Sequence, residues 1–364
     1  MLFALCSQAN AAYVFRALDG LWGNPTDINS SGAIIGSSYQ TSSFTSTLWS
    51  EGGITYPGRV DSTHSYGVGI NNSGRIALNV HPLSLSSSTA YAGISGALVK
   101  LDSLNSISSY AIDLNERGNV VGWTGDGNGG QTKVNATVWE GGVARILRTA
   151  STATAINDAG QAVGYDNTSS YLWDGSETLL LGSLGGRTTA TDINNLGQVI
   201  GYGNTLSNAF DSRAIIWEGG VARDLGALSG TVSYALAIND RGQIVGKYRA
   251  DLGEFRAAIW GSSGGIDLNE LLDDEPQRAG WVLRSANSIN ANGWIAGQAD
   301  NVQLGIYGSA YLLSTSVVPE PNSLALVLTG LFSFFVVLRK RGVPGMPESS
   351  EPTRTGGIAQ LPAI

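Results

Sequence analysis

Side chains that commonly carry catalysis are scarce in this chain of 364 residues, which has two histidines, His64 and His81, and a single cysteine, Cys6. A histidine acts as a base or a metal ligand in contexts such as H-x-x-H, H-E-x-x-H or G-x-S-x-G. Neither histidine lies in such a context, because their neighbours are residues such as Ser65 and Pro82. We expect structural or solvent-facing roles for both, and no disulfide or thiolate metal site.

Two acidic segments can be compared with metal and carboxylate sites. Residues 125–130 read Gly-Asp-Gly-Asn-Gly-Gly and resemble a calcium loop, but the closing bidentate glutamate is absent. We therefore favour a hairpin loop there. The run Asp273, Asp274 and Glu275 precedes a proline, and adjacent acids point in different directions, as in a solvated loop. The sequence thus predicts no metal, no cofactor and no catalytic site.

Composition restricts the class of protein. Charged residues make up 14% of the chain, the net charge is −8, and there are 49 glycines. Affinity for nucleic acid depends on clustered Lys and Arg, so we exclude that partner. The abundance of glycine indicates short strands joined by tight turns rather than helices.

An aliphatic residue followed by Asn-x-x-Gly occurs seven times, so an internal repeat organises most of the chain. Successive asparagines are separated by 42, 44, 42, 37, 45 and 51 residues. A second glycine follows the first after four residues, except in the second repeat, where Leu78 replaces it. We expect the asparagines to shape turns, with ligand binding as the alternative role: Asn29, Asn71, Asn115, Asn157, Asn194, Asn239 and Asn290.

Each Asn-x-x-Gly element predicts a hairpin, because an asparagine side chain bonds the turn backbone and glycine supplies a positive φ. In the sixth repeat we expect strands over residues 232–238, 243–248, 255–260 and 265–268. Four short strands per repeat of about 42 residues match a β-propeller blade, whereas a β-helix coil needs roughly half that period.

The two ends of the repeat region complement each other. The seventh repeat has no fourth strand after residues 309–313, while residues 13–18 resemble the fourth strands of other repeats, such as residues 221–225. We therefore predict an all-β fold over residues 12–316: a β-propeller of seven four-stranded blades, closed when the N-terminal strand joins the last blade. Closure would remove free sheet edges, which invite aggregation.

A tryptophan ends the expected third strand in five repeats: Trp49, Trp139, Trp173, Trp217 and Trp260. Aromatic faces can stack on sugars, but a tryptophan at the same place in successive blades is typical of the core between sheets. We expect these five in the core. Four others fall outside this periodicity and are candidates for a rim or a pocket: Trp22, Trp123, Trp281 and Trp294.

Residues 1–11 read as the end of a secretory signal, because a short apolar run precedes Ala9-Asn10-Ala11, an A-x-A cleavage pattern. We expect cleavage after Ala11. The basic region of a complete signal is missing, which indicates a start codon upstream of Met1. The alternative is an N-terminal strand end without a signal.

Residues 317–341 combine three elements in order. A Pro-Glu-Pro motif is followed by residues 323–338, which are uncharged and mostly apolar, and then by a basic triplet. Sixteen helical residues span roughly 24 Å, slightly less than a bilayer core of about 30 Å, and flanking basic side chains can snorkel. We predict a transmembrane helix over residues 323–338 with the triplet in the cytoplasm, and a disordered tail over residues 342–364.

This order closely resembles the PEP-CTERM sorting signal of Gram-negative bacteria, which an exosortase recognises. The family usually ends soon after the basic cluster, whereas 23 residues follow it here. A plain membrane anchor is the alternative. The resemblance implies an exosortase as partner and the following recognition residues: Pro319, Glu320, Pro321, Arg339, Lys340 and Arg341.

The repeats, for example residues 237–246, are also similar to the extracellular HAF repeat family, although the His-Ala-Phe triplet is replaced, as in Arg-Ala-Ile-Ile-Trp over residues 213–217. The two resemblances imply an exported protein with an inner-membrane intermediate that then reaches the cell surface or the extracellular space, in a setting of exopolysaccharide. We expect a non-enzymatic envelope or matrix protein that binds polysaccharide or surface proteins. The alternatives are a propeller-type polysaccharide hydrolase or lyase, and a membrane-anchored scaffold.

Overall fold

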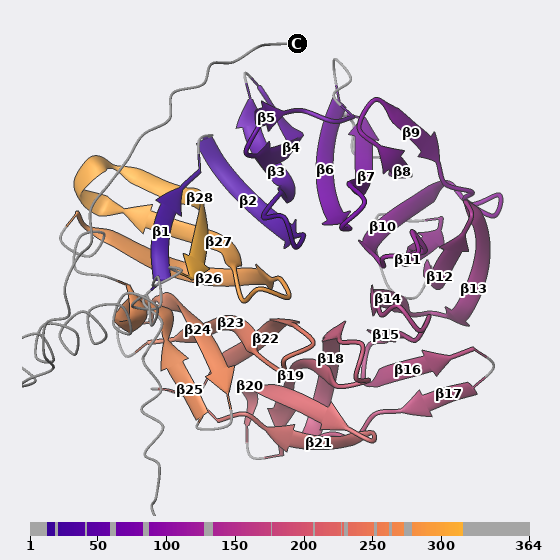
Figure 1. Ribbon diagram of the computed structural model, residues 1–364. Coiled ribbons are helices and arrows are strands. Elements are labelled where there is room, and N and C mark those ends of the chain that lie inside the picture. Colours follow the sequence, from indigo (N-terminus) through magenta and orange to yellow (C-terminus); the bar gives the residue numbers. More distant parts are fainter. Residues whose placement is uncertain are drawn as a thin grey trace, which may run out of the picture. The chain divides into compact units, whose positions relative to one another are not determined.

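The computed structural model describes residues 13–18, 21–40, 42–58, 63–82, 87–126, 134–175, 177–206, 208–226, 228, 232–250, 253–261, 264–272 and 279–315. They form seven four-stranded sheets arranged as blades around a central axis (Figure 1). The all-β, seven-bladed propeller predicted from the repeats is confirmed.

The first strand of each blade lines the central channel, and the following strands lie progressively further out. Blade 1 contains β2 (Leu21–Ile28), β3 (Ile34–Gln40), β4 (Ser43–Ser50) and β5 (Gly53–Thr55). Blade 2 contains β6 (Thr63–Ile70), β7 (Arg75–Pro82), β8 (Thr89–Ile94) and β9 (Ala97–Lys100). Blade 3 contains β10 (Ser108–Leu114), β11 (Val120–Gly125), β12 (Val134–Glu140) and β13 (Val143–Thr149). Blades 4 and 5 contain β14 (Thr152–Ile156), β15 (Ala162–Tyr165), β16 (Ser170–Asp174) and β17 (Glu177–Leu180); β18 (Gly185–Ile193), β19 (Val199–Thr205), β20 (Asn208–Glu218) and β21 (Val221–Asp224). Blades 6 and 7 contain β22 (Ser233–Ile238), β23 (Ile244–Arg249), β24 (Phe255–Gly261) and β25 (Gly264–Asp267); β26 (Trp281–Ile289), β27 (Ile295–Asn301), β28 (Ile306–Thr315) and β1 (Tyr13–Ala17).

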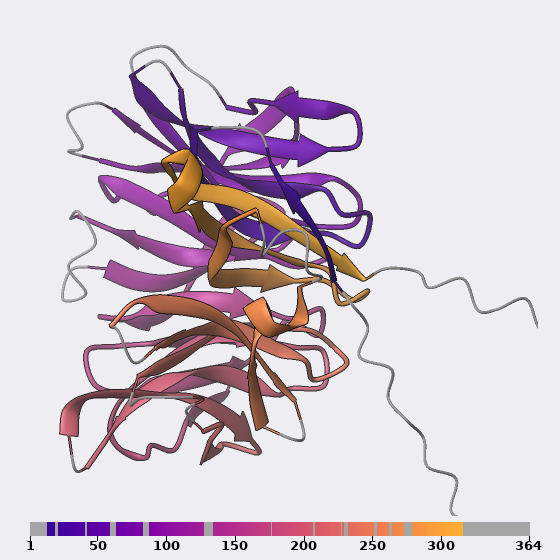
Figure 2. The same cartoon turned by 90° about the vertical axis from the view of Figure 1, so that its left-hand side faces the viewer.

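The ring is closed by β1, which is the outer strand of blade 7. It pairs antiparallel with β28, from Tyr13 opposite Thr315 to Ala17 opposite Tyr311. The side view shows the indigo β1 beside the yellow β28 (Figure 2). Closure by the N-terminal strand is therefore confirmed, and the outer edge of β28 is covered.

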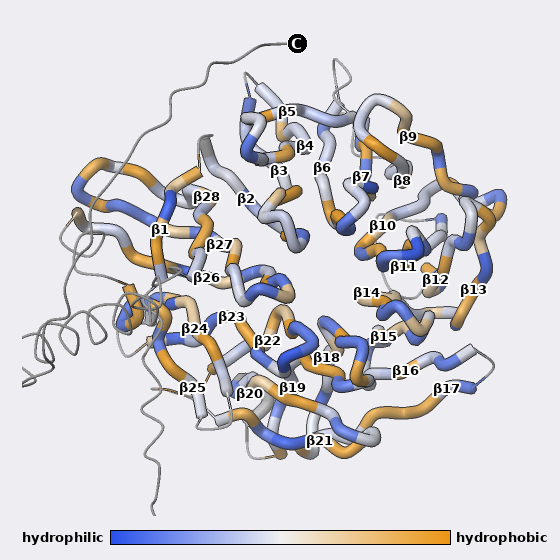
Figure 3. Tube along the Cα trace, in the orientation of Figure 1, coloured by the Kyte–Doolittle hydropathy of each residue, from blue (hydrophilic) through white to orange (hydrophobic). Residues whose placement is uncertain are grey.

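The Asn-x-x-Gly turns have the expected backbone. The glycine three residues after each asparagine has a positive φ, between 72° and 91° in all seven blades. Hydrophilic turns surround the centre of the ring in the hydropathy view (Figure 3). This local geometry explains why the element recurs, since a residue with a Cβ is strained at such a φ.

The second glycine of each repeat meets a close backbone contact. A Cβ on Gly246 would lie 1.9 Å from the carbonyl oxygen of Tyr234, and the other five such glycines have an equivalent contact of 1.9 to 2.2 Å. The contact accompanies a β-bulge in the first strand, such as the register shift between Ala235 and Ala237. In blade 2 the second glycine of the repeat is replaced by Leu78. The small residue at this contact is instead Gly67, which lies opposite Leu78 on the paired strand β6.

The hydrophobic core lies between neighbouring blades. One cluster combines Ile200 and Ala214 of blade 5 with Ile238 and Trp260 of blade 6. The five periodic tryptophans are each at most 3% exposed. They occupy the core, as their periodicity predicts, and three donate an indole N–H to a backbone carbonyl: Trp139 to Asp102, Trp217 to Gly182 and Trp260 to Gly226.

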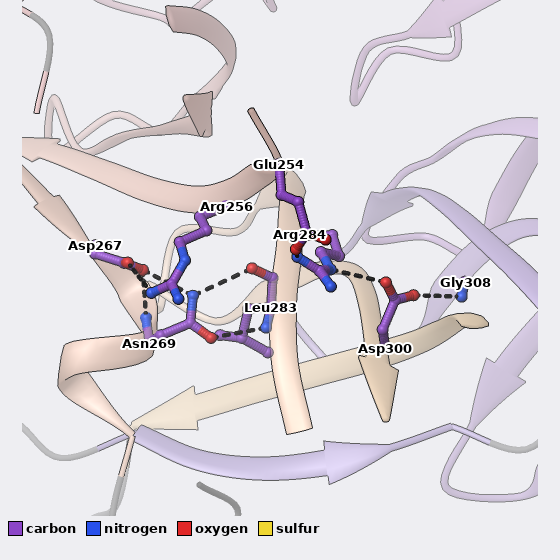
Figure 4. A network of polar contacts seen from close by, with 8 residues as sticks. All are labelled: Glu254, Arg256, Asp267, Asn269, Leu283, Arg284, Asp300 and Gly308. Carbon is purple, nitrogen blue, oxygen red and sulfur yellow. Dashed lines mark hydrogen bonds and ion pairs between the residues drawn. The ribbon is translucent and has the colours of Figure 1, made fainter. Parts of the chain in front are cut away.

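Polar contacts join blade 6 to blade 7 (Figure 4). The side chain of Asn269, in the 3-10 helix η2 (Leu268–Leu271), exchanges two hydrogen bonds with the backbone of Leu283 in β26, and its amide also donates to Asp267. Arg256 pairs with Asp267 at 3.0 Å. Arg284 of blade 7 contacts both Glu254 and Asp300.

No helix in the described ranges is long and apolar enough to span a membrane. Besides η2, these ranges contain the 3-10 helix η3 (Val302–Leu304). The predicted signal (residues 1–11), transmembrane segment (residues 323–338) and tail (residues 342–364) lie outside the described residues.

Candidate functional site

The seven repeat asparagines form a closed ring of hydrogen bonds at one end of the central channel. Each side-chain amide donates to the backbone carbonyl of the asparagine in the next blade, over 2.9 to 3.3 Å. Each side-chain oxygen also accepts from the backbone N–H four residues later. The amides thus serve their own turns and the contacts between blades.

Three aspartates lie next to this ring in the channel, each two residues before the asparagine of blade 1, 3 or 5. Asp27, Asp113 and Asp192 each accept a hydrogen bond from the next residue's N–H and another from a backbone N–H of the following blade, over 2.7 to 2.9 Å. Each carboxylate therefore fastens two neighbouring blades together. Sequence reasoning missed them, although an acid two residues before the asparagine in alternate repeats is a visible signal.

The channel strongly affects the ionisation of these carboxylates. Burial raises the pKa of Asp27, and it raises that of Asp192 to about 7. The pKa of Asp113 lies well above its usual value because of burial and the charges of Asp27 and Asp192. Backbone hydrogen bonds oppose these shifts.

The channel has two mouths. The mouth at the asparagine ring is a polar hollow of about 280 Å³, which the three aspartates also line. The opposite mouth is a wider cavity of about 510 Å³, lined by residues such as Asn24, Tyr110 and Leu236. No group of three or more His, Cys, Asp or Glu side chains in the described ranges is placed to hold a metal ion, so the aspartates do not form such a site.

Eight aromatic rings form a continuous row across blades 1, 2 and 3, which we call the aromatic row. Neighbouring ring centroids are 5.4 to 6.4 Å apart. The last pair, Tyr110 and Trp123, is stacked with an interplanar angle of 1°. The members are Trp22, Tyr39, Phe44, His64, Tyr66, His81, Tyr110 and Trp123.

The row lies at the wider mouth of the channel. The asparagine turns join the first and second strands at one end of each blade. Seven of the row residues lie toward the opposite ends of these strands, as in the pair Tyr110 and Trp123, and Phe44 lies beside Tyr39 at the start of the third strand. Tyr110 lines the wide mouth. At its other end, Trp22 and Phe44 line a cavity of about 530 Å³ with Gln298 and Tyr307 of blade 7. The row therefore connects a peripheral cavity with the channel.

Trp22 is the most exposed member of the row. Its side chain is 62% exposed, and its backbone is held at a φ of +50°, where only a few per cent of non-glycine residues lie. It follows Leu21 in a segment where the pairing of β2 with β3 shifts register. Leu104, Asn105 and Ala150 also have a positive φ, so Trp22 is distinguished by combining this backbone conformation with an exposed ring.

The two histidines lie in strands β6 and β7 and belong to the row. They are cross-strand partners, and the Nδ1 atom of His64 accepts a hydrogen bond from the Phe44 N–H at 3.1 Å. Burial, and then the neighbouring His64, lowers the pKa of His81. Both side chains contribute flat rings to a surface of aromatic residues.

The other candidate positions divide into three groups. Trp22 is exposed at a rim, whereas Trp123 is only 8% exposed and is stacked on Tyr110. Trp281 packs on Phe15 of β1, and Trp294 is partly buried against the core between blades 1 and 7. Asp126, from the calcium-like loop, accepts from the Ile107 N–H, and residues 127–130 lie outside the described ranges. The three adjacent acids and the predicted sorting residues also lie outside the described ranges: Asp273, Asp274, Glu275, Pro319, Glu320, Pro321, Arg339, Lys340 and Arg341.

No family model and no curated protein matches the chain. Among solved structures it is similar to virginiamycin B lyase from Staphylococcus aureus, with 8% identity and a TM-score of 0.53, covering 83% of this chain and 98% of the other. It also matches the β-propeller domain of the Trilobed protease from Pyrococcus furiosus, with 12% identity and a TM-score of 0.36, covering 68% and 98%. The first likeness shows the β-propeller fold alone.

Proposed function

We propose that this protein is an exported, non-enzymatic component of the cell envelope or matrix that binds polysaccharide through the aromatic row. The observation that carries the proposal is the row itself, which places eight rings in contact across three blades at one end of the propeller. Its exposed end at Trp22 and Tyr39 is open to solvent.

Polysaccharide is the partner whose chemistry fits this surface. The apolar C–H face of a sugar ring packs well on an aromatic ring, and the polar edges of tyrosine and histidine can bond its hydroxyl groups. A linear arrangement of rings suits an extended polymer better than a compact ligand.

The environment of the titratable groups favours binding over catalysis. A general acid or base needs a proton-exchanging atom within reach of a substrate. The three channel aspartates instead use both carboxylate oxygens to accept backbone N–H groups. The histidines lie among aromatic rings that they contact edge-on or at a tilt.

The export part of the proposal rests on the resemblance to the PEP-CTERM signal, which the HAF-like repeats accompany. In this proposal residues 323–338 form a transient transmembrane helix, an exosortase recognises the Pro-Glu-Pro motif at Pro319, Glu320 and Pro321, and the propeller is released to the surface.

The binding proposal can be tested with the exopolysaccharide of the producing bacterium and with two neutral glucans, dextran and hydroxyethyl cellulose. We expect the Trp22→Ala, Tyr39→Ala double variant to bind the preferred polymer about tenfold more weakly, equivalent to about 1.4 kcal/mol. Trp22→Phe, which keeps a ring, should retain most of the affinity. Leu196→Ala, which removes a 70% exposed apolar side chain from an asparagine turn at the other end of the ring, is the matched control.

Both variants of the exposed rings should unfold at the wild-type temperature, because few contacts are lost. If no polymer binds, or if binding is insensitive to Trp22 and Tyr39, the row is not a polysaccharide site.

Sorting can be tested by locating the native protein in its host with and without the exosortase. We expect a mature form that begins near Ala12, ends near Pro319 and leaves the inner membrane only when the exosortase is present. A full-length chain in the inner membrane of both strains would show an ordinary anchor instead.

A further inference from the structure

A second group of aromatic residues lies on blades 5 and 6, and it carries positive charge. Tyr202 of β19 contacts Tyr234 of β22 edge-on at 4.8 Å, and Tyr234 contacts Phe255 of β24 at 5.9 Å. The Lys247 ammonium lies 5.6 Å from the centre of the Tyr234 ring and 4.9 Å from that of Phe255. The Arg249 guanidinium lies 5.3 Å from the Phe255 ring. We call these five residues the cationic cluster.

The two cations of this cluster have no acidic partner in the part of the chain that the structure describes. Among the described residues, no carboxylate lies within ion-pair distance of Lys247 or Arg249. Within the described ranges, the carboxylate nearest to Arg249 in sequence is that of Glu254, and it contacts Arg284 of blade 7 (Figure 4). Asp251 lies outside these ranges. Arg256, next to Phe255, is paired with Asp267. Within the described ranges, Arg256 and Arg284 are therefore paired with carboxylates, whereas Lys247 and Arg249 are not.

Lys247 is also partly removed from water. Its side chain is half-buried between rings, and this burial lowers the pKa of its ammonium group. A desolvated cation without a counter-ion attracts an anion more strongly than a fully hydrated one. The surrounding rings can at the same time pack against the carbon skeleton of the molecule that bears the anion.

The cluster faces the same end of the propeller as the aromatic row. Tyr234 lies five residues before the asparagine of its blade and pairs with Lys247, just as Tyr110 pairs with Trp123. The wide mouth of the channel lies between the two groups, since both Tyr110 of blade 3 and Leu236 of blade 6 line it. One end of the ring thus presents a neutral aromatic surface and a cationic one.

We infer that the cationic cluster is a binding site for the carboxylate groups of an acidic polysaccharide, such as uronic acid residues. The aromatic row would hold neutral sugars of the same chain, so the choice of ligand rests on the function proposed above. Lys247 and Arg249 contact the carboxylate, and Tyr234 and Phe255 pack against the sugar ring.

The experiment compares binding of polygalacturonate with that of its methyl-esterified form, which has the same backbone without the charge. Wild type should bind polygalacturonate at least about tenfold more tightly at low salt, and this preference should shrink as salt screens the charges. Lys247→Ala with Arg249→Ala should abolish the preference. Lys100→Ala with Arg223→Ala removes equal charge from exposed outer-strand positions and should preserve it.

A preference that persists without Lys247 and Arg249, or that the control pair abolishes equally, overturns the inference. So does a wild-type preference for dextran sulfate over dextran with none for polygalacturonate, because the anion would then be a sulfate. The Trp22→Ala, Tyr39→Ala variant separates the two proposals. If that variant binds the host exopolysaccharide and the neutral glucans as wild type does, while the charge preference still requires Lys247 and Arg249, the row proposal fails and the carboxylate site stands.

Discussion

The side-chain amide of Asn290 donates a hydrogen bond to the backbone carbonyl of Asn29, 2.9 Å away, and so joins the last blade of the propeller to the first. The two residues are separated by 261 positions in the chain. An equivalent hydrogen bond joins each of the other six pairs of neighbouring blades, so the asparagines form a closed ring of hydrogen bonds.

Asn290→Ala should destabilise the protein by about 3 kcal/mol. The change removes the bond to Asn29 and two bonds that the Asn290 side-chain oxygen accepts from the N–H groups of Asn292 and Trp294, all at a buried position. Urea unfolding would measure the loss. Asn292→Ala is the control, because Asn292 also crosses the closure, to the Ser30 carbonyl, but from an exposed position. If both variants lost the same free energy of unfolding, the asparagine ring would have no special role in stability.

Phe15→Ala should weaken the closure made by β1. The Phe15 ring lies 5.2 Å from that of Trp281 and 6.1 Å from that of Tyr311, in the core of blade 7. Because Phe15 is only partly buried, we expect a loss of about 2 kcal/mol rather than the roughly 3 to 5 kcal/mol of a fully buried phenylalanine. Its neighbour Val14 is 47% exposed, so Val14→Ala should cost much less in the same unfolding experiment.

Gly246→Ala should be among the most damaging single changes in the blade interior. Its Cβ would lie 1.9 Å from the Tyr234 carbonyl oxygen, so the strands would have to separate at the bulge. We expect a loss of at least about 3 kcal/mol, measured by thermal or urea unfolding. Gly261→Ala, in the same blade, has open space around its Cβ and should be nearly neutral. A mild effect of Gly246→Ala would show that the bulge is adaptable.

The stability of the propeller should depend on pH through Asp192. Burial raises its pKa from 3.8 to about 7. Between pH 4 and pH 7 the Asp192 carboxyl of the folded chain holds a proton that the unfolded chain has released. The contribution of this group to the free energy of unfolding is therefore fully present below about pH 4 and is lost as the pH rises through about 7. The Asp192→Asn variant has no such titration. Its stability relative to wild type should therefore increase from pH 4 to pH 8, by up to about 4 kcal/mol for three pKa units.

The comparison uses the pH dependence rather than the stability at one pH, because asparagine can replace only one of the two carboxylate acceptors that bond Ile193 and Ile238. Glu177→Gln, at an exposed position on β17, is the control and should follow wild type at all pH values. Parallel curves for Asp192→Asn and wild type would show that the carboxylate is fully ionised across this range.

The blade architecture could be predicted because each repeat encodes it locally. An asparagine that bonds its own turn and a glycine at positive φ define the hairpin within five residues, and seven copies define the number of blades. The sixth repeat illustrates the accuracy: strands expected over residues 232–238 and 255–260 are Ser233–Ile238 and Phe255–Gly261. The closing strand was predictable as well, because residues 13–18 supply what the seventh repeat lacks.

The surfaces of the ring could not be predicted in this way. In the aromatic row, Tyr39 contacts Phe44 within one blade, whereas Phe44 contacts Tyr66, and His81 contacts Tyr110, across neighbouring blades. Contacts across blades depend on the twist of each sheet and on which strand ends face each other. A tyrosine five residues before the asparagine in repeats 2, 3 and 6 was the available signal, but it did not show which rings would touch.

By itself, the sequence determined the class of fold, the number of blades, the conformation of the turns and the closing strand, since these follow from bonds and φ values within single repeats. Only the tertiary structure decided that Asp27, Asp113 and Asp192 join neighbouring blades, that His64 and His81 belong to an aromatic surface, and that Lys247 lacks a counter-ion among the described residues. The physical reason is that each of these depends on side chains from separate strands or blades, whose distances and burial arise only when the ring is assembled.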